Sequence, residues 1–469
     1  MGRDAILQLM VGFVIASLIL PIGFTLLISE ASAGGTNQPD GYWPMERGNP
    51  QRNGTSSFNV SESKPHVLWD IDLTKMAGWN ESDRIVGAVF SCVAEDGTIY
   101  LANGANVSAI YPDGSLRWTI GLIDRSHMCP AIGGNGDLYI GAYGYDGNPL
   151  VQYSAIYSIT PNGLIKWRLQ LPEIALMLLV DESNTIYASV WGFKNVDQNN
   201  TELTSNVLVA ITPDGSIKWR YSVPVISQHW SICIPAIAPD GTIRFQTEGS
   251  LVAINSDGTI EWTFDLPSRE AYESNIPLVT ENGTTITICN QALLSIDSEG
   301  RLQWSYDFQM TVDSYSRWLI YANQMIYLYN PGWQNFLTAI RDNGTLAWTI
   351  YDNDFSYYGP VMSHNGLILI LNDFNQLEAI TANGTKVWKT EPLYTATSSS
   401  GPTEIVIGAE DRIYLRHFNN NDGTPVSLIA VGYEDEHPII SSPPIWVWIG
   451  LAIVVIAVAG GFLLWRRSK

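Results

Sequence analysis

The residues that most often do chemistry in proteins are scattered along this chain. Six histidines stand at His66, His127, His229, His364, His417 and His437, and no two of them have the spacing of metal ligands. The four cysteines form neither a C-x-x-C pair nor a zinc-binding pattern. Nucleophile elbows, phosphate-binding loops and zinc-protease helices are also missing from the sequence. We therefore predict a protein that is not an enzyme and that carries no metal or cofactor.

Aromatic side chains are the remaining residues with a recognisable task, because exposed rings stack on sugars and grip peptides. The candidates for a ligand-binding surface are Tyr143, Tyr145, Trp191, Phe193, His229, Trp230, Trp333 and Tyr357. Four of them lie in the two longest segments that interrupt the regular sequence pattern, Gly141–Ser154 and Trp191–Asn206. The alternative is that these rings pack beneath their own loops.

A ten-residue repeat positions these segments. Its clearest copy, residues 210–219, is Ala-Ile-Thr-Pro-Asp-Gly-Ser-Ile-Lys-Trp, and six more copies begin at residues 109, 158, 253, 295, 339 and 379. A glycine stands four residues before the tryptophan in every copy, which predicts a strand, a tight turn and a second strand. The tryptophans recur every 40 to 52 residues. That period, with about four strands in each unit, is typical of β-propeller blades.

Each unit also carries an earlier hairpin, such as Asp96-Gly97-Thr98-Ile99-Tyr100, which completes four strands per blade. We interpret the repeat tryptophans as structural, each wedged between blades with its indole N–H bonded to a backbone carbonyl. These docking residues are Trp69, Trp118, Trp167, Trp219, Trp262, Trp304, Trp348 and Trp388. Both glycine turns of a blade fall on one face of the ring, the turn face. The other connections, including the aromatic segments, fall on the opposite loop face.

Two partial units at the ends of the domain complete each other. Residues 66–73 contain Trp69 but have no blade before them, and residues 403–432 predict three strands with no tryptophan strand after them. Pairing them closes the ring, which removes exposed sheet edges. The sequence therefore predicts an all-β, eight-bladed propeller of four-stranded antiparallel blades, with seven blades as the alternative.

The repeat resembles the tryptophan-docking repeat of the pyrroloquinoline-quinone (PQQ)-like β-propeller superfamily. The opening Trp43-Pro44-Met45-Glu46-Arg47-Gly48-Asn49-Pro50-Gln51-Arg52-Asn53-Gly54 is similar to the lead-in segment of many such domains. The resemblance covers residues 43–433 and implies the fold rather than an activity. The superfamily includes quinoprotein dehydrogenases and non-enzymatic propellers such as the outer-membrane assembly lipoprotein, and we place this chain closer to the second group.

A PQQ-dependent oxidoreductase is the alternative that the resemblance implies. Such enzymes typically have a disulfide between adjacent cysteines over the quinone and a calcium ion held by Glu and Asn, with an Asp base. This chain has no adjacent cysteines. A weaker alternative is a polysaccharide-active enzyme, which would need two carboxylates about 5–10 Å apart.

Two apolar runs bracket the domain. We expect residues 1–33 to be a signal peptide or an uncleaved signal anchor, residues 34–65 a linker and lead-in, and residues 66–433 the propeller. After a linker at 434–444, residues 445–465 are long enough to cross a membrane, and the basic tail 466–469 should stay cytoplasmic. These features predict a single-pass protein of the cell membrane whose propeller is extracytoplasmic.

The charge and the export signal set further expectations. A net charge of −21 argues against nucleic acid as a partner. In an exported domain, each Asn-x-Ser/Thr sequence is a candidate glycosylation site. These sequences begin at Asn53, Asn59, Asn80, Asn106, Asn199, Asn282, Asn343 and Asn383. Cys92 and Cys129 fall near the inner strands of consecutive units and could form a disulfide, although we favour small buried hydrophobic residues at all four cysteines. The predicted partner is a surface protein or a glycan.

Overall fold

A computed structural model describes residues 44–76, 91–126, 129–145, 152–197, 200–224, 234–267, 276–308, 318–330, 336–355, 359–394, 402–417 and 427–433, without residues 46, 248 and 290. The predicted signal segment, C-terminal linker, transmembrane helix and tail lie outside this part. Within it, no helix has the length and hydropathy that a membrane crossing requires.

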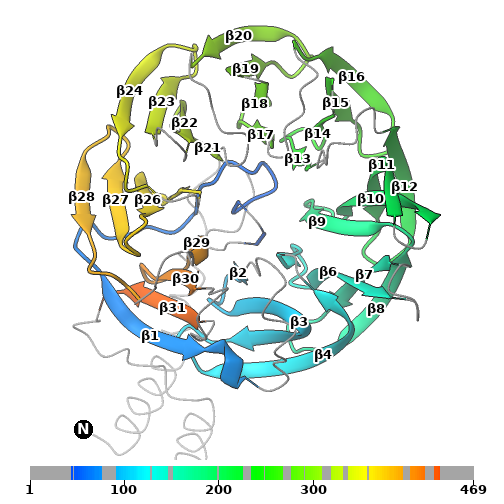
Figure 1. The fold of residues 1–469 in the computed structure, drawn as a ribbon, viewed down its shortest axis with the longest axis horizontal. Coiled ribbons are helices and arrows are strands. Elements are labelled where there is room, and N and C mark those ends of the chain that lie inside the picture. Colours follow the sequence, from blue (N-terminus) through cyan, green and yellow to red (C-terminus); the bar gives the residue numbers. More distant parts are fainter. Residues whose placement is uncertain are drawn as a thin grey trace, which may run out of the picture. The chain divides into compact units, whose positions relative to one another are not determined.

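Eight blades form a ring in the described part of the chain (Figure 1). Six are separate four-stranded antiparallel sheets, and the other two are joined in one seven-stranded sheet. The eight-bladed prediction is confirmed, and the seven-bladed alternative is wrong. We number the blades from the one that contains both ends of the propeller.

The strands follow the repeat in chain order. Blade 1 contains β29 (Pro402–Ile407), β30 (Ile413–His417), β31 (Ser427–Gly432) and β1 (His66–Asp72), which is followed by the short 3-10 helix η1 (Leu73–Lys75); blade 2 contains β2 (Ser91–Val93), β3 (Ile99–Ile110) and β4 (Leu116–Ser126); blade 3 contains β5 (Ala131–Ile132), β6 (Leu138–Tyr145), β7 (Gln152–Ile159) and β8 (Ile165–Leu171); and blade 4 contains β9 (Ile174–Val180), β10 (Ile186–Asp197), β11 (Asn200–Ile211) and β12 (Ile217–Pro224).

The second half of the ring is more regular. Blade 5 contains β13 (Ala236–Ile237), β14 (Ile243–Gln246), β15 (Ser250–Ile254) and β16 (Ile260–Asp265); blade 6 contains β17 (Leu278–Val279), β18 (Thr285–Cys289), β19 (Ala292–Ile296) and β20 (Leu302–Asp307); blade 7 contains β21 (Trp318–Ala322), β22 (Met325–Asn330), β23 (Phe336–Arg341) and β24 (Leu346–Tyr351); and blade 8 contains β25 (Val361–Met362), β26 (Leu367–Leu371), β27 (Leu377–Thr381) and β28 (Lys386–Lys389).

Blade 2 departs from the predicted pattern of four separate strands. The start of β3, Ile99–Leu101, pairs with β2, and its end, Asn106–Ile110, pairs with β4. The single element β3 thus takes the place of both the second and the third strand of the other blades. Gly104, at a φ of +56°, lies between the two parts.

The repeat fixes the register of each outer hairpin. In blade 4, Ala210 pairs directly with Trp219, and a bulge follows before Ile211 pairs with Ile217. Every other copy of the repeat pairs its alanine or serine with its tryptophan in the same way. A small side chain opposite the tryptophan leaves the indole room to turn towards the next blade.

Each docking tryptophan bonds to the neighbouring blade. The eight indole N–H groups donate to backbone carbonyls 2.6–3.1 Å away, with Trp69 bound to Pro112, Trp118 to Pro161, Trp167 to Pro213, Trp219 to Ser256, Trp262 to Ser298, Trp304 to Asp342, Trp348 to Ala382 and Trp388 to Ser61. In seven of these contacts the carbonyl belongs to an outer hairpin turn, and the indole lies against that turn's glycine. Each repeat therefore supplies an indole and also the glycine turn on which the indole of the preceding blade lies.

The eighth contact closes the ring without a covalent hairpin. Strand β1 pairs with β31 from His66 opposite Gly432 to Asp72 opposite Ser427, as the two partial units predict. Since no turn joins these strands, the carbonyl of Ser61 accepts the bond from Trp388 instead. The Tyr433 hydroxyl donates to the same carbonyl and to that of Ser63, at 3.1 and 2.6 Å.

The lead-in segment lies inside the ring, where the blue trace crosses the centre of Figure 1. Inner-strand N–H groups of Ile132, Ile237, Val279, Tyr321 and Met362 donate to the carbonyls of Pro44, Pro50, Gln51, Asn53 and Gly54 respectively, at 2.8–3.0 Å. Each donor lies directly before an inner hairpin turn, so the segment occupies the turn-face end of the channel. The sequence boundary at residue 66 misses this, because residues 44–60 are an integral part of the propeller.

The glycine turns allow a matched test of docking. Gly258 and Gly241 both have a left-handed backbone, with φ of +90° and +82°, but a Cβ at Gly258 would lie 2.8 Å from the Trp219 ring, whereas one at Gly241 meets nothing within 4 Å. We expect Gly241→Ala to cost about 1–2 kcal/mol of unfolding free energy from backbone strain alone. Gly258→Ala should cost about 1–3 kcal/mol more, because the ring must move. Equal losses in denaturant titrations would show that the indole contact does not constrain the turn.

A candidate binding site on the loop face

The structure describes only part of the predicted aromatic surface. Tyr143 is half-buried at the end of β6. Tyr145 lies in β6, and Trp191 and Phe193 lie in β10, but their side chains are outside the described part, as are His229, Trp230, Trp333 and Tyr357 entirely. What the structure does establish is the scaffold: β6 and β10 belong to neighbouring blades, 3 and 4 (Figure 1).

The two long segments are extensions of β-hairpins. In blade 3, β6 and β7 pair from Leu138 opposite Ile159 to Tyr145 opposite Gln152. In blade 4, β10 and β11 pair from Ile186 opposite Ile211 to Asp197 opposite Asn200. Corresponding strands of blades 5 to 8 have four to six residues, whereas β10 and β11 have twelve each. Both extensions continue towards the loop face.

A buried carboxylate ties the blade 3 extension to blade 2. Asp124, on β4, is 1% exposed and accepts hydrogen bonds from the hydroxyls of Tyr153 and Tyr157 at 2.8 and 2.5 Å and from Arg168 Nε at 2.7 Å. The Arg168 guanidinium also lies 5.6 Å from the centre of the Tyr153 ring. One carboxylate thus holds side chains from β7 and β8 to the end of β4.

The environment keeps this carboxylate ionised. Burial raises the pKa of Asp124, but the hydrogen bonds from Arg168, Tyr157 and Tyr153 outweigh burial and hold its pKa below the usual value. The bond to Asp124 likewise raises the pKa of Arg168, and burial raises the pKa of Tyr157. The cluster is therefore a satisfied ion pair with fixed protons, which suits a structural clamp better than an acid–base catalyst.

The end of β4 adds a main-chain clamp. Arg125 pairs with Tyr143 on β6, and the Ser126 hydroxyl donates to the Gly141 carbonyl at 2.9 Å. These contacts join blades 2 and 3 into the seven-stranded sheet. At Gly141 and Tyr143, β6 is therefore held by a strand from the preceding blade.

A second ion pair repeats the arrangement between blades 3 and 4. Glu173 accepts from Arg220 Nη1 at 2.6 Å, and its backbone carbonyl accepts from the Ser154 hydroxyl at 2.5 Å. Both acids stand six residues after a docking tryptophan, and both arginines stand directly after the next one. That spacing is a signal in the sequence from which both ion pairs could have been predicted.

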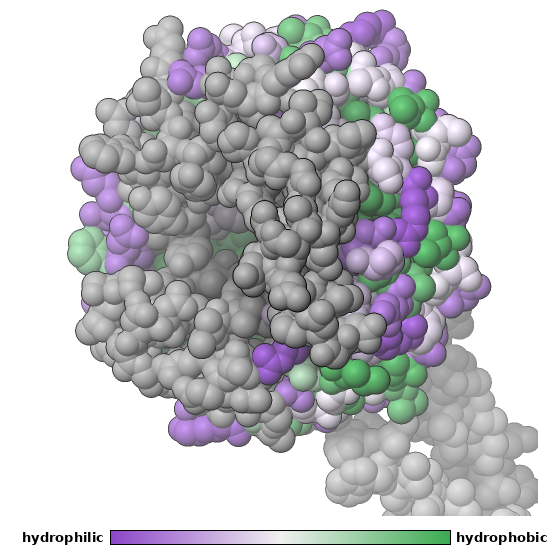
Figure 2. Space-filling model, turned by 45° about the vertical axis from the view of Figure 1, so that its right-hand side comes forward, coloured by the Kyte–Doolittle hydropathy of each residue, from purple (hydrophilic) through white to green (hydrophobic). Residues whose placement is uncertain are grey.

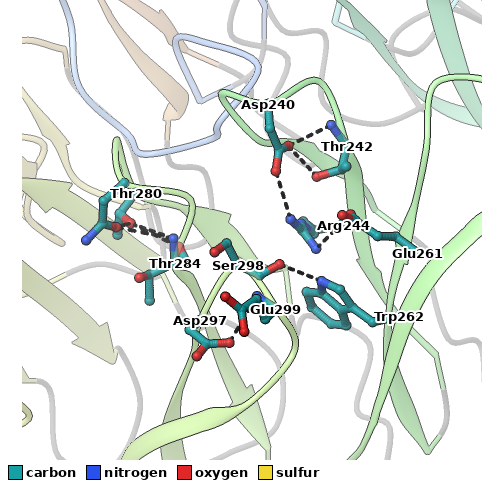
Figure 3. A network of polar contacts seen from close by, with 11 residues as sticks. Asp240, Thr242, Arg244, Glu261, Trp262, Thr280, Thr284, Asp297, Ser298 and Glu299 are labelled. Atoms are coloured by element: carbon teal, nitrogen blue, oxygen red, sulfur yellow. Dashed lines mark hydrogen bonds and ion pairs between the residues drawn. The ribbon is translucent and has the colours of Figure 1, made fainter.

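Arg244 stands at a position of the inner hairpin motif that is a tyrosine in most other blades (Figure 3). In five blades a tyrosine of the second strand packs on the docking tryptophan, with ring centres 5.9–6.1 Å apart. Blade 5 has Arg244 there instead, fully buried, with its guanidinium 4.5 Å from the centre of the Trp262 ring and near the carboxylates of Asp240 and Glu261. Burial lowers the pKa of Arg244, which the two carboxylates partly offset. This network packs blade 5 rather than opening onto a site.

The outer rim offers no continuous apolar patch in the described residues. Aliphatic side chains two residues before the tryptophans are 41–52% exposed, namely Leu116, Ile165, Ile217, Ile260, Leu302 and Leu346. They are interleaved with polar side chains, and the described surface of the rim alternates in the same way in Figure 2. Single exposed aliphatic residues of this kind are normal on protein surfaces.

The channel bears on the quinone alternative. Inner-strand residues such as Ile132, Val279 and Met362 are buried and apolar, and the lead-in segment occupies one end of the channel. Arg47 reaches from that segment over the Trp318 ring and donates to the Leu319 and Pro360 carbonyls. Among the described residues, no three His, Cys, Asp or Glu side chains are grouped to hold a metal ion. These channel contacts are those of an internal plug.

The modification sites stay predictions. Asn59, Asn282, Asn343 and Asn383 are exposed, Asn53 and Asn106 are half-buried, and Asn80 and Asn199 lie outside the described residues. Cys92, Cys129 and Cys289 are buried, and Cys233 lies outside the described residues. The Cys129 sulfur lies 3.9 Å from the carbonyl of Ser91, beside the strand that carries Cys92.

Comparisons with known proteins agree with the architecture. No family model matches the chain, and no curated protein matches its sequence. BamB from Moraxella catarrhalis is 14% identical over 80% of this chain and all of its own, with a TM-score of 0.54. A europium-containing methanol dehydrogenase is 11% identical over 84% of this chain and 99% of its own, with a TM-score of 0.58.

The chain shares the β-propeller fold of these structures. A quinohemoprotein alcohol dehydrogenase from Pseudomonas putida HK5 shares the fold at 11% identity, covering 84% of this chain and 80% of its own, with a TM-score of 0.57. The structural neighbours of this propeller thus include both BamB and enzymes. At such identities the likeness shows the fold alone and does not choose between binding and catalysis.

The buried ion pair predicts a pH-dependent loss of stability. Asp124→Asn leaves Arg168 without its carboxylate, and we expect a cost of about 3 kcal/mol of unfolding free energy at neutral pH. Because the folded-state pKa of Asp124 is lowered, its contribution is full above the unfolded pKa of about 3.9 and is lost as pH falls through the folded value. The difference in unfolding free energy between wild type and Asp124→Asn should therefore shrink as the pH falls below about 4.

Exposed Asp265→Asn is the matched control and should change stability by less than about 0.5 kcal/mol. Denaturant titrations at several pH values measure all three proteins. A gap for Asp124→Asn that stays constant down to pH 3 would contradict an ionised, hydrogen-bonded carboxylate.

Proposed function

We propose that this PQQ-like propeller is a membrane-anchored, extracytoplasmic binding module that takes a surface protein or a glycan on the loop face of blades 3 and 4. One observation carries the proposal. The two longest hairpins of the ring stand in neighbouring blades, and the clamps at Asp124 and Glu173 fix their bases. A platform that is rigid before binding loses less entropy when a partner arrives.

The chain path supports an outward loop face. Tyr433, the last described residue, bonds to the carbonyls of Ser61 and Ser63, where Trp388 also docks, so the chain leaves the ring on the turn face. Residues 434–444 would then lead to the predicted membrane helix at 445–465 within about 40 Å of extended chain. In this arrangement the turn face lies towards the membrane and the hairpins point away from it.

The channel contacts favour binding over the quinoprotein alternative. The lead-in segment fills the turn-face end of the channel with the protein's own backbone, and its polar side chains bond to backbone carbonyls there. The strongly acidic chain also suits partners other than nucleic acid.

Shortened hairpins test the proposal directly. Full-length chain in native membranes is cross-linked with a short amine-reactive reagent, and the solubilised domain is screened on a glycan array. We expect one reproducible protein or glycan ligand. Its binding should weaken at least tenfold when residues 144–153 and 193–204 are each replaced by Asn-Gly.

Asp257→Asn, on an outer turn, should leave ligand binding unchanged. A ligand retained in full by the doubly shortened variant would contradict the assignment to this face. Failure to find any protein or glycan ligand would contradict the function itself.

A further inference from the structure

Two outer hairpin turns of neighbouring blades contain the same three residues. In blade 7 the turn Asn343-Gly344-Thr345 joins β23 to β24, and in blade 8 the turn Asn383-Gly384-Thr385 joins β27 to β28. Both lie on the turn face, and the docking tryptophan of the preceding blade lies against each glycine. The sequence alone makes these two sites and six others equal candidates for glycosylation.

Exposure separates the two sites from the other candidates in the described part of the chain. A transferase must reach both the asparagine and the hydroxyl residue two positions later, because these two residues define its acceptor sequence. Both are exposed at Asn343 and Thr345 and at Asn383 and Thr385. At least one of the two is buried or half-buried in the other described sites, at Asn53, Asn59, Asn106 and Asn282.

The turns use only one atom of each asparagine amide. Asn343 Oδ1 accepts from the backbone N–H of Thr345 at 3.1 Å and from its hydroxyl at 2.7 Å. Asn383 Oδ1 accepts from the N–H of Thr385 at 3.3 Å and from the Thr381 hydroxyl. Neither Nδ2 atom bonds to another described residue. The turn therefore fixes the oxygen and leaves to solvent the nitrogen, which is the atom that carries an N-linked glycan.

Hairpin geometry does not require that nitrogen. Blade 5 has Asp257 at the equivalent position, and its carboxylate accepts from the N–H and hydroxyl of Thr259 at 2.9 and 2.6 Å. Asp113 in blade 2 and Asp214 in blade 4 accept the backbone N–H two residues later in the same way. An amide in this turn therefore adds a group that the fold itself does not use.

We propose that Asn343 and Asn383 are a pair of N-glycosylation sites that cover the turn face of blades 7 and 8 with oligosaccharide. In the transfer, Nδ2 forms a bond to the anomeric carbon of a lipid-linked oligosaccharide. The bond from that carbon to the phosphate of the lipid carrier breaks, and the phosphate leaves with one amide proton. Oδ1 keeps its hydrogen bonds, so the turn accepts the modification without a backbone change.

This inference rests on the extracytoplasmic placement in the proposed function. In that arrangement the turn face lies towards the membrane, which holds the lipid carrier. The hairpins of blades 3 and 4 point the other way and stay bare for their partner. Bulky, solubilising glycans on blades 7 and 8 would thus keep other molecules from the turn face without blocking the loop face.

The test is glycopeptide mass spectrometry of the full-length chain purified from the membranes of its native host. We expect an oligosaccharide at both Asn343 and Asn383. Its occupancy at each should be at least tenfold higher than at Asn282, which has the same Asn-Gly-Thr sequence but a threonine, Thr284, that is only 8% exposed.

Two variants made in the same host separate glycosylation from the turn. Asn343→Asp combined with Asn383→Asp keeps the Oδ1 acceptors, and should lose both glycans while the melting temperature stays within about 3 °C of wild type. Asp257→Asn creates an exposed Asn-Gly-Thr sequence and should gain a glycan at residue 257. Asn162, at the same turn position of blade 3 but followed by Gly163 and Leu164, should stay unmodified in every sample.

The outcomes distinguish this inference from the proposed function. A chain that surface labelling places outside the cell, but that lacks glycans at Asn343 and Asn383, would overturn the inference alone. Equal occupancy at Asn282, or no gain of a glycan in Asp257→Asn, would show that exposure in the turn does not select the sites and would also overturn it. A chain that carries both glycans but has no protein or glycan ligand would contradict the proposed function alone, and a chain inside the cell would contradict both.

Discussion

Contact between an indole and the glycine turn of the next blade is the constraint on which this ring depends. A propeller blade is a small sheet with two apolar faces, and it cannot bury both unless its neighbours stay at a fixed angle. The tryptophan sets that angle, because its ring covers the turn and its N–H satisfies a turn carbonyl. Such a bond contributes about 1 kcal/mol. Repeated eight times around a closed ring, it secures the turn face as one cooperative surface.

Closure extends the same contact to the chain's own ends. Ser61 offers Trp388 the carbonyl that a hairpin turn offers elsewhere, and the lead-in segment before it spans the inner strands of five blades. The turn face is therefore fully used by the protein itself. Among the described residues, ion pairs near the opposite face join neighbouring blades at Asp124–Arg168, Glu173–Arg220 and Asp352–Lys386. The long hairpins of the proposed site extend beside the first two pairs.

The repeat made the architecture predictable. Glycine and tryptophan at a fixed spacing predict the hairpin, the docking residue and the number of blades, because each depends on local turn geometry and one neighbour. The lead-in plug was not predictable in this way. Its contacts join residues such as Gly54 and Met362 that are far apart in sequence, and no periodic signal specifies them.

The candidate site likewise has features that the sequence predicts and features that only the structure shows. Hairpin length could be read from the insertions, and the spacing after the docking tryptophans marks the Asp124–Arg168 pair. The hydroxyls of Tyr153 and Tyr157, which complete the cluster, have no such repeated spacing. The hairpin motif aligns Arg244 with Tyr100, but only the structure shows that its guanidinium lies over the Trp262 ring. Contacts that no repeated spacing marks are the ones that sequence patterns leave out.

Hydrogen exchange of the full-length chain, followed by mass spectrometry, tests most directly whether the docking contacts lock the turn face. We predict the slowest exchange in peptides from the outer strands around the docking tryptophans and from residues 44–60. In the Gly258→Ala variant, whose Cβ would meet the Trp219 ring, peptides covering residues 253–262 should exchange at least about tenfold faster than in the wild type. Exchange of these peptides that is unchanged by the substitution would show that the indole contact does not lock the turn, and would contradict this account.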